Sequence, residues 1–247
     1  MIEPYYEEPS IKIYCGDCLE VMKDIPDKSI DMILCDLPYG TTACKWDTII
    51  PFEPLWKQYK RIIKDNRAIV LTASQPFTSA LVMSNPKMFK YCWIWDKTTA
   101  KGHLVAKIRP MQQTEDICVF GYGKINYFPQ MINRIKSVKS FEAKRTEIMG
   151  GESNGYKKEY TKWYPKTLLI FKTERSLHPT QKPVALFEYF IKTYTNEGDL
   201  VLDNCVGSGT TLVACKELNR KGIGIEISKE YCDIAVQRLK NTTPNLL

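Results

Sequence analysis

The sequence lacks the features that mark membrane, secreted or low-complexity proteins. None of its apolar runs approaches the roughly 18 residues that a membrane span needs, and Met1 to Ser10 carry three Glu but neither Lys nor Arg. Only 13 of its 247 residues are Gly and 14 are Pro, while 44% are hydrophobic and 26% are charged. We therefore expect one large globular domain, with or without an insertion, and neither membrane insertion nor secretion.

Histidine is also scarce, since His103 and His178 are the only two. The nine cysteines are odd in number and scattered, and Cys15 and Cys18 form the one C-x-x-C pair. A structural zinc would need two further ligands close to that pair. We therefore expect reduced thiols and no metal site.

Positive charge is concentrated in the middle of the chain. The net charge is +7, yet residues 97–112 hold four basic and no acidic residues, and residues 124–175 hold twelve basic and five acidic ones. The remainder is mildly acidic. This distribution indicates one surface that faces a polyanion such as nucleic acid, with a solvated lysine-rich insertion as the alternative.

Apolar patterns along the chain predict alternating strands and helices. Strands are expected at residues 11–14, 30–35, 68–72, 91–95, 116–120, 167–171, 200–202 and 222–227, and helices at 54–64, 79–83, 183–193, 210–218 and 228–239. The periodicity is lost between residues 121 and 165, which indicates an inserted recognition region or long loops. The fold class is therefore α/β with a mostly parallel sheet.

A glycine-rich turn follows the predicted strand at 200–202. Asp203 to Thr211 reads Asp-Asn-Cys-Val-Gly-Ser-Gly-Thr-Thr and leads into a helix. No third glycine follows at the spacing of a dinucleotide site, and no Gly-Lys-Ser/Thr of a phosphate-binding loop is present. Glu226 ends the next strand 17 residues beyond Gly209, where a carboxylate can accept hydrogen bonds from ribose hydroxyls. The pattern predicts a ribose-bearing cofactor without a pyrophosphate.

A second polar group follows the predicted strand at 30–35. Asp36-Leu37-Pro38-Tyr39 places a carboxylate, a backbone carbonyl and an aromatic ring at one strand end. These groups can grip a planar base that bears an amino group, with Asp36 and the Leu37 carbonyl as acceptors and Tyr39 as the stacking face. The alternative is a turn that Asp36 caps while Tyr39 packs in the core.

Three motifs together resemble those of the amino-group DNA methyltransferases. Asp36 to Tyr39 is similar to their Asp-Pro-Pro-Tyr motif, and Asp203 to Thr211 is similar to their S-adenosylmethionine loop. His178 to Pro183 (His-Pro-Thr-Gln-Lys-Pro) resembles the segment that lies at the methionine end of the cofactor. The motif order, with the catalytic motif first, is that of the circularly permuted beta group.

The resemblance implies a three-layer, Rossmann-like, S-adenosylmethionine-dependent methyltransferase fold. Residues 1–121 and 166–247 would form the catalytic domain, and residues 122–165 the target recognition region. The residues implied in catalysis are Asp36, Leu37, Pro38 and Tyr39. The residues implied in binding S-adenosylmethionine are Asp17, Cys18, Thr180, Lys182, Asp203, Gly207, Ser208, Gly209, Thr210, Thr211, Glu226 and Ile227. In this set Asp17 would contact the adenine, Glu226 the ribose, and Lys182 would lie near the methionine carboxylate.

An Asp at the first motif position, where cytosine-N4 enzymes usually carry Ser, favours methylation of adenine N6 in double-stranded DNA after base flipping. Cytosine-N4 methylation and an inactive DNA-binding relative are the alternatives. Phosphate contacts are expected from Lys97, Lys101, Lys107, Arg109, Arg134, Lys136 and Lys139. The resemblance further implies a cytoplasmic protein of bacterial or phage origin, with a homodimer and a cognate restriction endonuclease as candidate partners.

Overall fold

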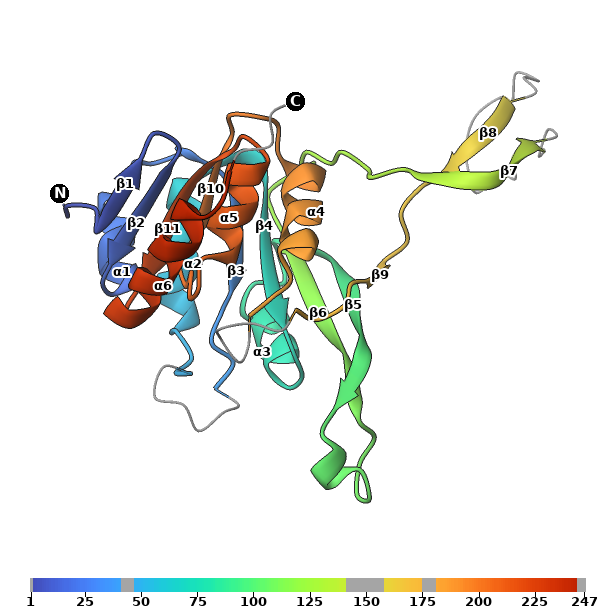
Figure 1. Ribbon diagram of the computed structural model, residues 1–247, viewed down its shortest axis with the longest axis horizontal. Coiled ribbons are helices and arrows are strands. Elements are labelled where there is room, and N and C mark those ends of the chain that lie inside the picture. Colours follow the sequence, from blue (N-terminus) through green and yellow to red (C-terminus); the bar gives the residue numbers. More distant parts are fainter. Residues whose placement is uncertain (1, 41–46, 141–157, 175–180, 244–247) are drawn as a thin grey trace. The chain divides into compact units, whose positions relative to one another are not determined.

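The computed structural model describes residues 2–40, 47–140, 158–174 and 181–243 (Figure 1). By internal contacts it separates into a larger unit, Met1–Phe128 with Thr167–Leu247, and a smaller unit, Pro129–Lys166. The strands of the larger unit are β1 (Tyr6–Glu8), β2 (Ile11–Cys15), β3 (Ile30–Asp36), β4 (Ile63–Ala73), β5 (Phe89–Lys101), β6 (Gln112–Phe120), β9 (Leu168–Ile170), β10 (Leu200–Asp203) and β11 (Lys221–Glu226). Its α-helices are α1 (Cys18–Val21), α2 (Phe52–Ile62), α3 (Phe77–Ser84), α4 (Val184–Tyr194), α5 (Thr210–Glu217) and α6 (Lys229–Lys240).

One nine-stranded sheet forms the centre of the larger unit. The strand order is β1-β2-β11-β10-β3-β4-β6-β5-β9. The five strands from β2 to β4 run parallel, while β6 is antiparallel to both β4 and β5. The carboxyl ends of β2, β11, β10, β3 and β4 therefore lie along one edge of the sheet, where Asp116 in the middle of β6 pairs with Ala73 of β4.

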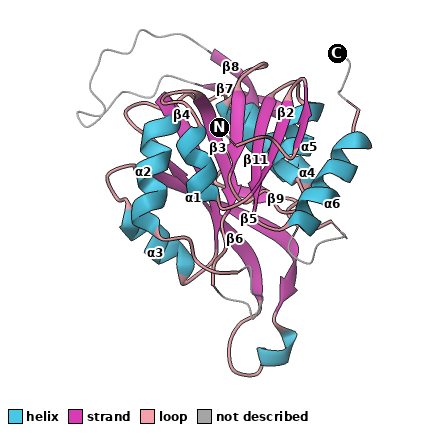
Figure 2. Cartoon of the chain, turned by 90° about the vertical axis from the view of Figure 1, so that its left-hand side faces the viewer, coloured by secondary structure: helices cyan, strands magenta, loops and turns pink. Residues whose placement is uncertain are grey.

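Helices cover both faces of this sheet, with α1, α2 and α3 on one side and α4, α5 and α6 on the other (Figure 2). The alternation of side chains along each central strand explains the two layers of core. In β3, Met32 and Leu34 face the cluster that contains Phe187 and Phe190 of α4, whereas Cys35 faces the cluster around α2. Central strands buried on both faces account for the continuous apolar runs in the sequence.

The smaller unit contains the antiparallel strands β7 (Ile132–Ser140) and β8 (Lys158–Trp163). The guanidinium of Arg134 stacks on the ring of Trp163, with Cζ 3.4 Å from the ring centroid. This pair of strands was not expected from the sequence, because its polar and apolar residues do not alternate regularly.

The predicted α/β class with a mostly parallel sheet is confirmed. Every predicted strand and helix falls on an observed element, although β4 and β5 are several residues longer than their apolar segments. Short elements such as β1 and α1 were missed. Across the described ranges, none of the helices has the length and apolar character to cross a bilayer.

Close packing of α5 on β11 depends on a glycine. A Cβ at Gly224 would lie 2.7 Å from Leu212 Cδ1 and 3.0 Å from Val206 Cγ2, which is too near for an unshifted side chain. We expect Gly224→Ala to lower the free energy of unfolding by about 1–3 kcal/mol through overpacking. Urea denaturation measures this loss.

Gly16→Ala is the matched control, because its Cβ would meet Val21 at an ordinary contact distance of 3.5 Å. We expect this variant to unfold within about 0.5 kcal/mol of the wild-type protein. Equal stability of all three proteins would show that α5 shifts freely on β11.

Candidate active site

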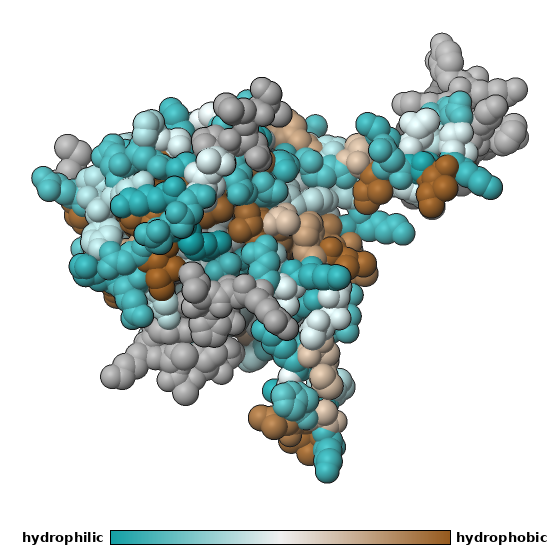
Figure 3. Space-filling view, in the orientation of Figure 1, coloured by the Kyte–Doolittle hydropathy of each residue, from teal (hydrophilic) through white to brown (hydrophobic). Residues whose placement is uncertain are grey.

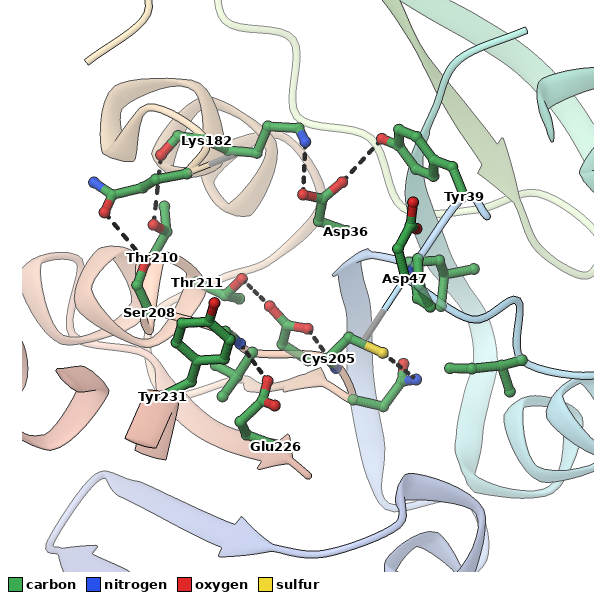
Figure 4. A pocket seen from close by; sticks show the side chains of 18 of the residues that line it. Asp36, Tyr39, Asp47, Lys182, Cys205, Ser208, Thr210, Thr211, Glu226 and Tyr231 are labelled. Atoms are coloured by element: carbon green, nitrogen blue, oxygen red, sulfur yellow. Dashed lines mark hydrogen bonds and ion pairs between the residues drawn. The ribbon is translucent and has the colours of Figure 1, made fainter. Parts of the chain in front are cut away.

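A cavity of about 810 Å³ opens at the carboxyl edge of the parallel strands. Its walls include the residues directly after β2, β11, β10 and β3, among them Asp17, Ile227, Asn204 and Leu37. Ligands in open α/β sheets bind at this edge, and the volume is that of a site for a cofactor-sized molecule. Figure 4 shows the polar side chains that converge on the cavity.

Asp36, at the end of β3, has both carboxylate oxygens engaged. Oδ1 accepts a hydrogen bond from the Tyr39 hydroxyl at 2.9 Å, and Oδ2 lies 2.6 Å from Nζ of Lys182 (Figure 4). Oδ1 also accepts from the Thr72 hydroxyl. Thr72 stands beside Asp36 because β3 and β4 pair in parallel register at these two residues. The carboxylate is held in one orientation at the cavity wall.

Lys182 joins Asp36 to a second carboxylate. Its Nζ lies 3.5 Å from Oε2 of Glu115, and Oε1 of Glu115 is 2.5 Å from Nζ of Lys97. Burial lowers the pKa of Lys182, but Asp36 and Glu115 outweigh it, so the pKa is raised and the ammonium stays charged. The four residues form a network of two cations and two anions, in which the lysines are buried and the carboxylates are partly buried.

The ammonium of Lys182 points to Asp36 in the structure. Its expected place near the methionine carboxylate of the cofactor stays a prediction. Its backbone does adjoin the glycine loop, since the carbonyl of Lys182 accepts from the Thr210 hydroxyl at 3.4 Å. Thr180, expected near the same carboxylate, lies outside the described residues.

The ring of Tyr39 forms an aromatic wall. It stacks on Phe77 with 5.2 Å between centroids and 26° between planes, and Nζ of Lys182 lies 5.6 Å from its centroid. Leu37 and Pro38 also line the cavity, with the Leu37 side chain buried in the core. The expected pairing of a carboxylate with an aromatic face is therefore present at the end of β3.

The loop after β10 contributes backbone and hydroxyl groups to the cavity. Gly207, with φ +50, has open space where a Cβ would stand. Ser208 donates to Gln181 Oε1 at 3.1 Å. Arg238 of α6 fixes the loop, because its Nη1 donates to the Ser208 carbonyl at 2.8 Å and lies 3.1 Å from the Thr210 hydroxyl.

Gly209 has a different role from the one expected. It is not among the residues that line the cavity. It adopts φ +87 at the start of α5, and a Cβ there would lie 2.9 Å from the Cβ of Ala235 in α6. Gly209 therefore serves the turn and the packing of α5 against α6 rather than the cavity wall.

Glu226 and Ile227 present a carboxylate and an apolar side chain side by side at the end of β11. Glu226 accepts from the Gly207 and Ser228 N–H groups, both at 2.9 Å. Burial raises the pKa of Glu226 despite these bonds. Ile227 is 66% exposed although it lines the cavity, which gives a planar ring an apolar surface.

Asp203 is buried behind the loop. It accepts from the Thr211 hydroxyl and, at 3.0 Å, from the Cys205 N–H. Its neighbour Asn204 accepts from the Tyr59 hydroxyl at 2.5 Å. Asp203 and Thr211 both line the cavity, and the hydrogen bonds of Asp203 to Thr211 and Cys205 hold the loop in place.

Asp17 and Cys18 line the wall next to β2. Asp17 caps α1 by accepting from the Leu19 N–H at 2.7 Å, so its position is set by the helix start. Cys18 Sγ lies 3.7 Å from the Asn204 amide nitrogen. The structure thus brings ten of the twelve expected cofactor residues to one cavity, Gly209 and the undescribed Thr180 excepted.

The expected phosphate contacts divide into three groups. Lys101, Lys107, Arg109 and Lys136 are exposed, and Arg134 is partly exposed. Lys97 is a correction, because it is only 5% exposed and its ammonium is paired with Glu115 inside the cavity. The side chain of Lys139 lies outside the described residues.

Sequence reasoning missed Glu115, Thr72 and Arg238. The register of β3 with β4 could have found Thr72, since Thr72 ends the predicted strand as Asp36 ends its neighbour. Glu115 and Arg238 gave no local signal, because one depends on the antiparallel pairing of β6 and the other on the packing of α6.

The sheet, the glycine loop and the paired Asp36 and Tyr39 define an α/β enzyme with a site for a nucleoside-bearing ligand. The chain belongs to the N6/N4 methyltransferase family described as DNA methylase, whose model matches residues 30–237. It is an S-adenosylmethionine-dependent amino DNA methyltransferase.

The chain is similar to several type II methyltransferases. M.HpaI of Haemophilus parainfluenzae is 30% identical over 241 residues, which cover 92% of this chain and 74% of that protein. The M1.HpyAVI–SAM complex superposes with a TM-score of 0.64 at 28% identity, covering 92% of this chain and 99% of the other. PvuII DNA methyltransferase (cytosine-N4-specific) shares the fold, with a TM-score of 0.70 at 17% identity over 99% of this chain and 91% of its own.

The residues present fit the cofactor. S-adenosylmethionine combines a planar base, two ribose hydroxyls and a charged amino acid, and the cavity offers an exposed apolar side chain at Ile227, a buried acceptor at Glu226 and open backbone at Gly207. These groups lie in that order along the wall formed by β11 and the glycine loop.

We expect Arg238→Ala to weaken S-adenosylmethionine binding about tenfold, because the Ser208 carbonyl and the loop lose their fixing hydrogen bonds. Isothermal titration calorimetry measures the Kd. Lys240→Ala, exposed on the same helix, is the matched control and should leave the Kd unchanged. An unaltered Kd for Arg238→Ala would mean that other contacts set the loop.

Asp203 makes stability depend on pH. Burial raises its pKa to about 6, although the Thr211 hydroxyl and the Cys205 N–H oppose the rise. A carboxyl group with a raised folded-state pKa stabilises the fold fully below the unfolded pKa of about 4, and this contribution is lost as the pH rises through about 6.

We therefore expect the difference in free energy of unfolding, Asp203→Asn minus wild type, to be about 2 kcal/mol larger at pH 7.5 than at pH 4.5. Urea denaturation at both pH values measures the difference. Asp65→Asn, at a side chain that is 78% exposed, should show almost no such change. A pH-independent difference for Asp203→Asn would show that this group titrates normally.

Proposed function

We propose that the protein methylates the N6 amino group of adenine in double-stranded DNA at a specific site. The observation that carries the proposal is Asp36, oriented at the cavity wall beside the Tyr39 ring. The similarity to type II methyltransferases supports a role in modification alongside a restriction endonuclease.

The cavity supports two ligands at once. The wall with Glu226, Ile227 and Gly207 suits the cofactor, and the wall with Asp36, Tyr39 and Glu115 suits a planar base. A base paired in a duplex cannot enter such a cavity, so the target nucleotide must be flipped out of the helix, with Tyr39 as its stacking surface.

When bound, S-adenosylmethionine supplies a methyl group activated by the positive sulfonium. The chain's own part is to make the amino nitrogen a nucleophile, since its lone pair is delocalised into the ring. Asp36 and the Leu37 carbonyl accept the two amino hydrogens and stabilise the positive charge that develops on nitrogen. Asp36 then takes the proton that leaves the methylated amino group.

The target amino group needs an oxygen of Asp36 as its acceptor, and both oxygens already have partners in the structure. Oδ1 of Asp36 is engaged by Tyr39 and Thr72, so Oδ2 becomes available when Lys182 moves away. Oε2 of Glu115 lies 3.5 Å from that ammonium and, among the described residues, is a buried oxygen that accepts no hydrogen bond. The ammonium of Lys182 can therefore move from Asp36 to Glu115 and remain paired with a carboxylate.

Cytosine N4 is the alternative target, because it is an amino group of the same geometry and the family includes both activities. Asp36 favours adenine over it. An inactive DNA-binding relative is the other alternative. The cytoplasmic location, the homodimer, the restriction endonuclease and the recognition role of residues 122–165 stay predictions.

We expect the wild-type protein to form N6-methyladenine in mixed-sequence duplex DNA, and Asp36→Asn to lower the rate roughly a hundredfold or more, because the amide loses the charge that stabilises the transition state. Mass spectrometry of nucleosides after digestion measures the product. Binding of S-adenosylmethionine by calorimetry controls for folding and should change little.

N4-methylcytosine as the product would overturn the adenine assignment and keep the site. Cofactor binding without any methylated nucleoside from the wild-type protein would leave the inactive relative as the better description. Full activity of Asp36→Asn would remove Asp36 from the mechanism.

A further inference from the structure

The connection between β5 and β6 projects from the sheet as a hairpin (Figure 1). We call residues Lys101–Gln112 the hairpin tip. It begins and ends on the paired residues Lys101 and Gln112 and contains a short 3₁₀ turn at His103–Val105. Lys101, Lys107 and Arg109 lie in it, without any acidic residue.

Two large aliphatic side chains stand out from this charged tip. Leu104 is 90% exposed and Ile108 is 83% exposed. Figure 3 shows apolar surface gathered at the end of the hairpin. Leu and Ile are among the residues most often buried, so a pair this exposed within a cationic loop marks a surface whose packing partner is another molecule.

Strand direction places the tip beside the base-binding wall of the cavity. Because β6 is antiparallel to β4 and Asp116 in the middle of β6 pairs with Ala73 at the carboxyl end of β4, the first residues of β6 extend past that end. Lys101 and Gln112 both line the large cavity, and Nε2 of Gln112 donates to the Ser74 hydroxyl at 2.5 Å. The first and last residues of the tip therefore lie at the rim of the cavity that contains Asp36.

We propose that the hairpin tip is a wedge that inserts Leu104 and Ile108 into the base stack of the DNA, next to the target nucleotide. The proposal rests on the proposed function. Cationic side chains at the tip match the phosphates on either side of the opening, while the aliphatic side chains fill the space that the extruded base leaves. The wedge thereby offsets the cost of unstacking, which a flipping enzyme must meet.

The test compares a paired with a mispaired target. The double variant Leu104→Ala/Ile108→Ala is measured on an unmethylated duplex that contains the site that the wild-type protein methylates. It is also measured on the same duplex with a mismatch opposite the target base. We expect kcat/KM to fall about tenfold on the paired duplex and to stay within about threefold of wild type on the mismatch, which opens without help. Met83→Ala, at an apolar residue of α3 that is 72% exposed, is the control and should behave as wild type on both.

A second measurement needs no methyl transfer. With 2-aminopurine at an adenine position of the duplex that the wild-type protein binds most tightly, base extrusion appears as increased fluorescence. We expect the double variant to give a clearly smaller increase at saturating protein. If the wild-type protein methylates no DNA, the proposed function fails, and this signal still tests the wedge.

Three results would overturn the wedge. Activity of the double variant equal to wild type on the paired duplex is the first. An equal loss on the paired and mismatched duplexes is the second, because the tip would then serve binding rather than opening. The third is a wild-type protein that sediments as a dimer and a double variant that sediments as a monomer, together with that equal loss of activity. The tip would then form the contact between two copies of the chain.

Discussion

The ion-pair network of Lys182, Asp36, Glu115 and Lys97 is the constraint around which the active site is organised. Burying the two lysine ammonium groups costs several kcal/mol of hydration each, and pairing with the two carboxylates offsets that cost. The four residues come from the end of β3, the segment before α4, and the strands β6 and β5. Lys182 pairs with both carboxylates and Lys97 pairs with Glu115, so the network ties segments far apart in the sequence to one geometry.

Sequence patterns were sufficient where a residue's role depends on its own segment. The apolar run that ends at Asp36 predicts a buried strand with a polar group at its carboxyl end, and the structure has both. The strand, loop and helix around Gly207 and the carboxylate at Glu226 follow in the same way, because a short turn and the following strand determine their placement.

Roles that depend on contacts between distant segments could not be predicted. Lys182 lies 146 residues from Asp36 in the chain, and nothing in the sequence near it separates a bond to that carboxylate from one to a cofactor. Lys97 belongs to a basic stretch and reads as a phosphate contact, yet its partner Glu115 makes it part of the cavity. Gly209 stands within a glycine pair of the loop, but its neighbour Ala235 belongs to α6.

The direction of the strands assigns different tasks to the two parts of the sheet. In a parallel strand the carboxyl end alone reaches the active edge, so β2, β11 and β10 each deliver one short segment there, and these segments form the cofactor wall. The antiparallel pair β6 and β5 instead crosses the same edge twice, once in each direction. It can therefore place Glu115 and Lys97 inside the cavity and still continue outward as the hairpin tip, so that one pair of strands serves both the base pocket and the DNA outside it.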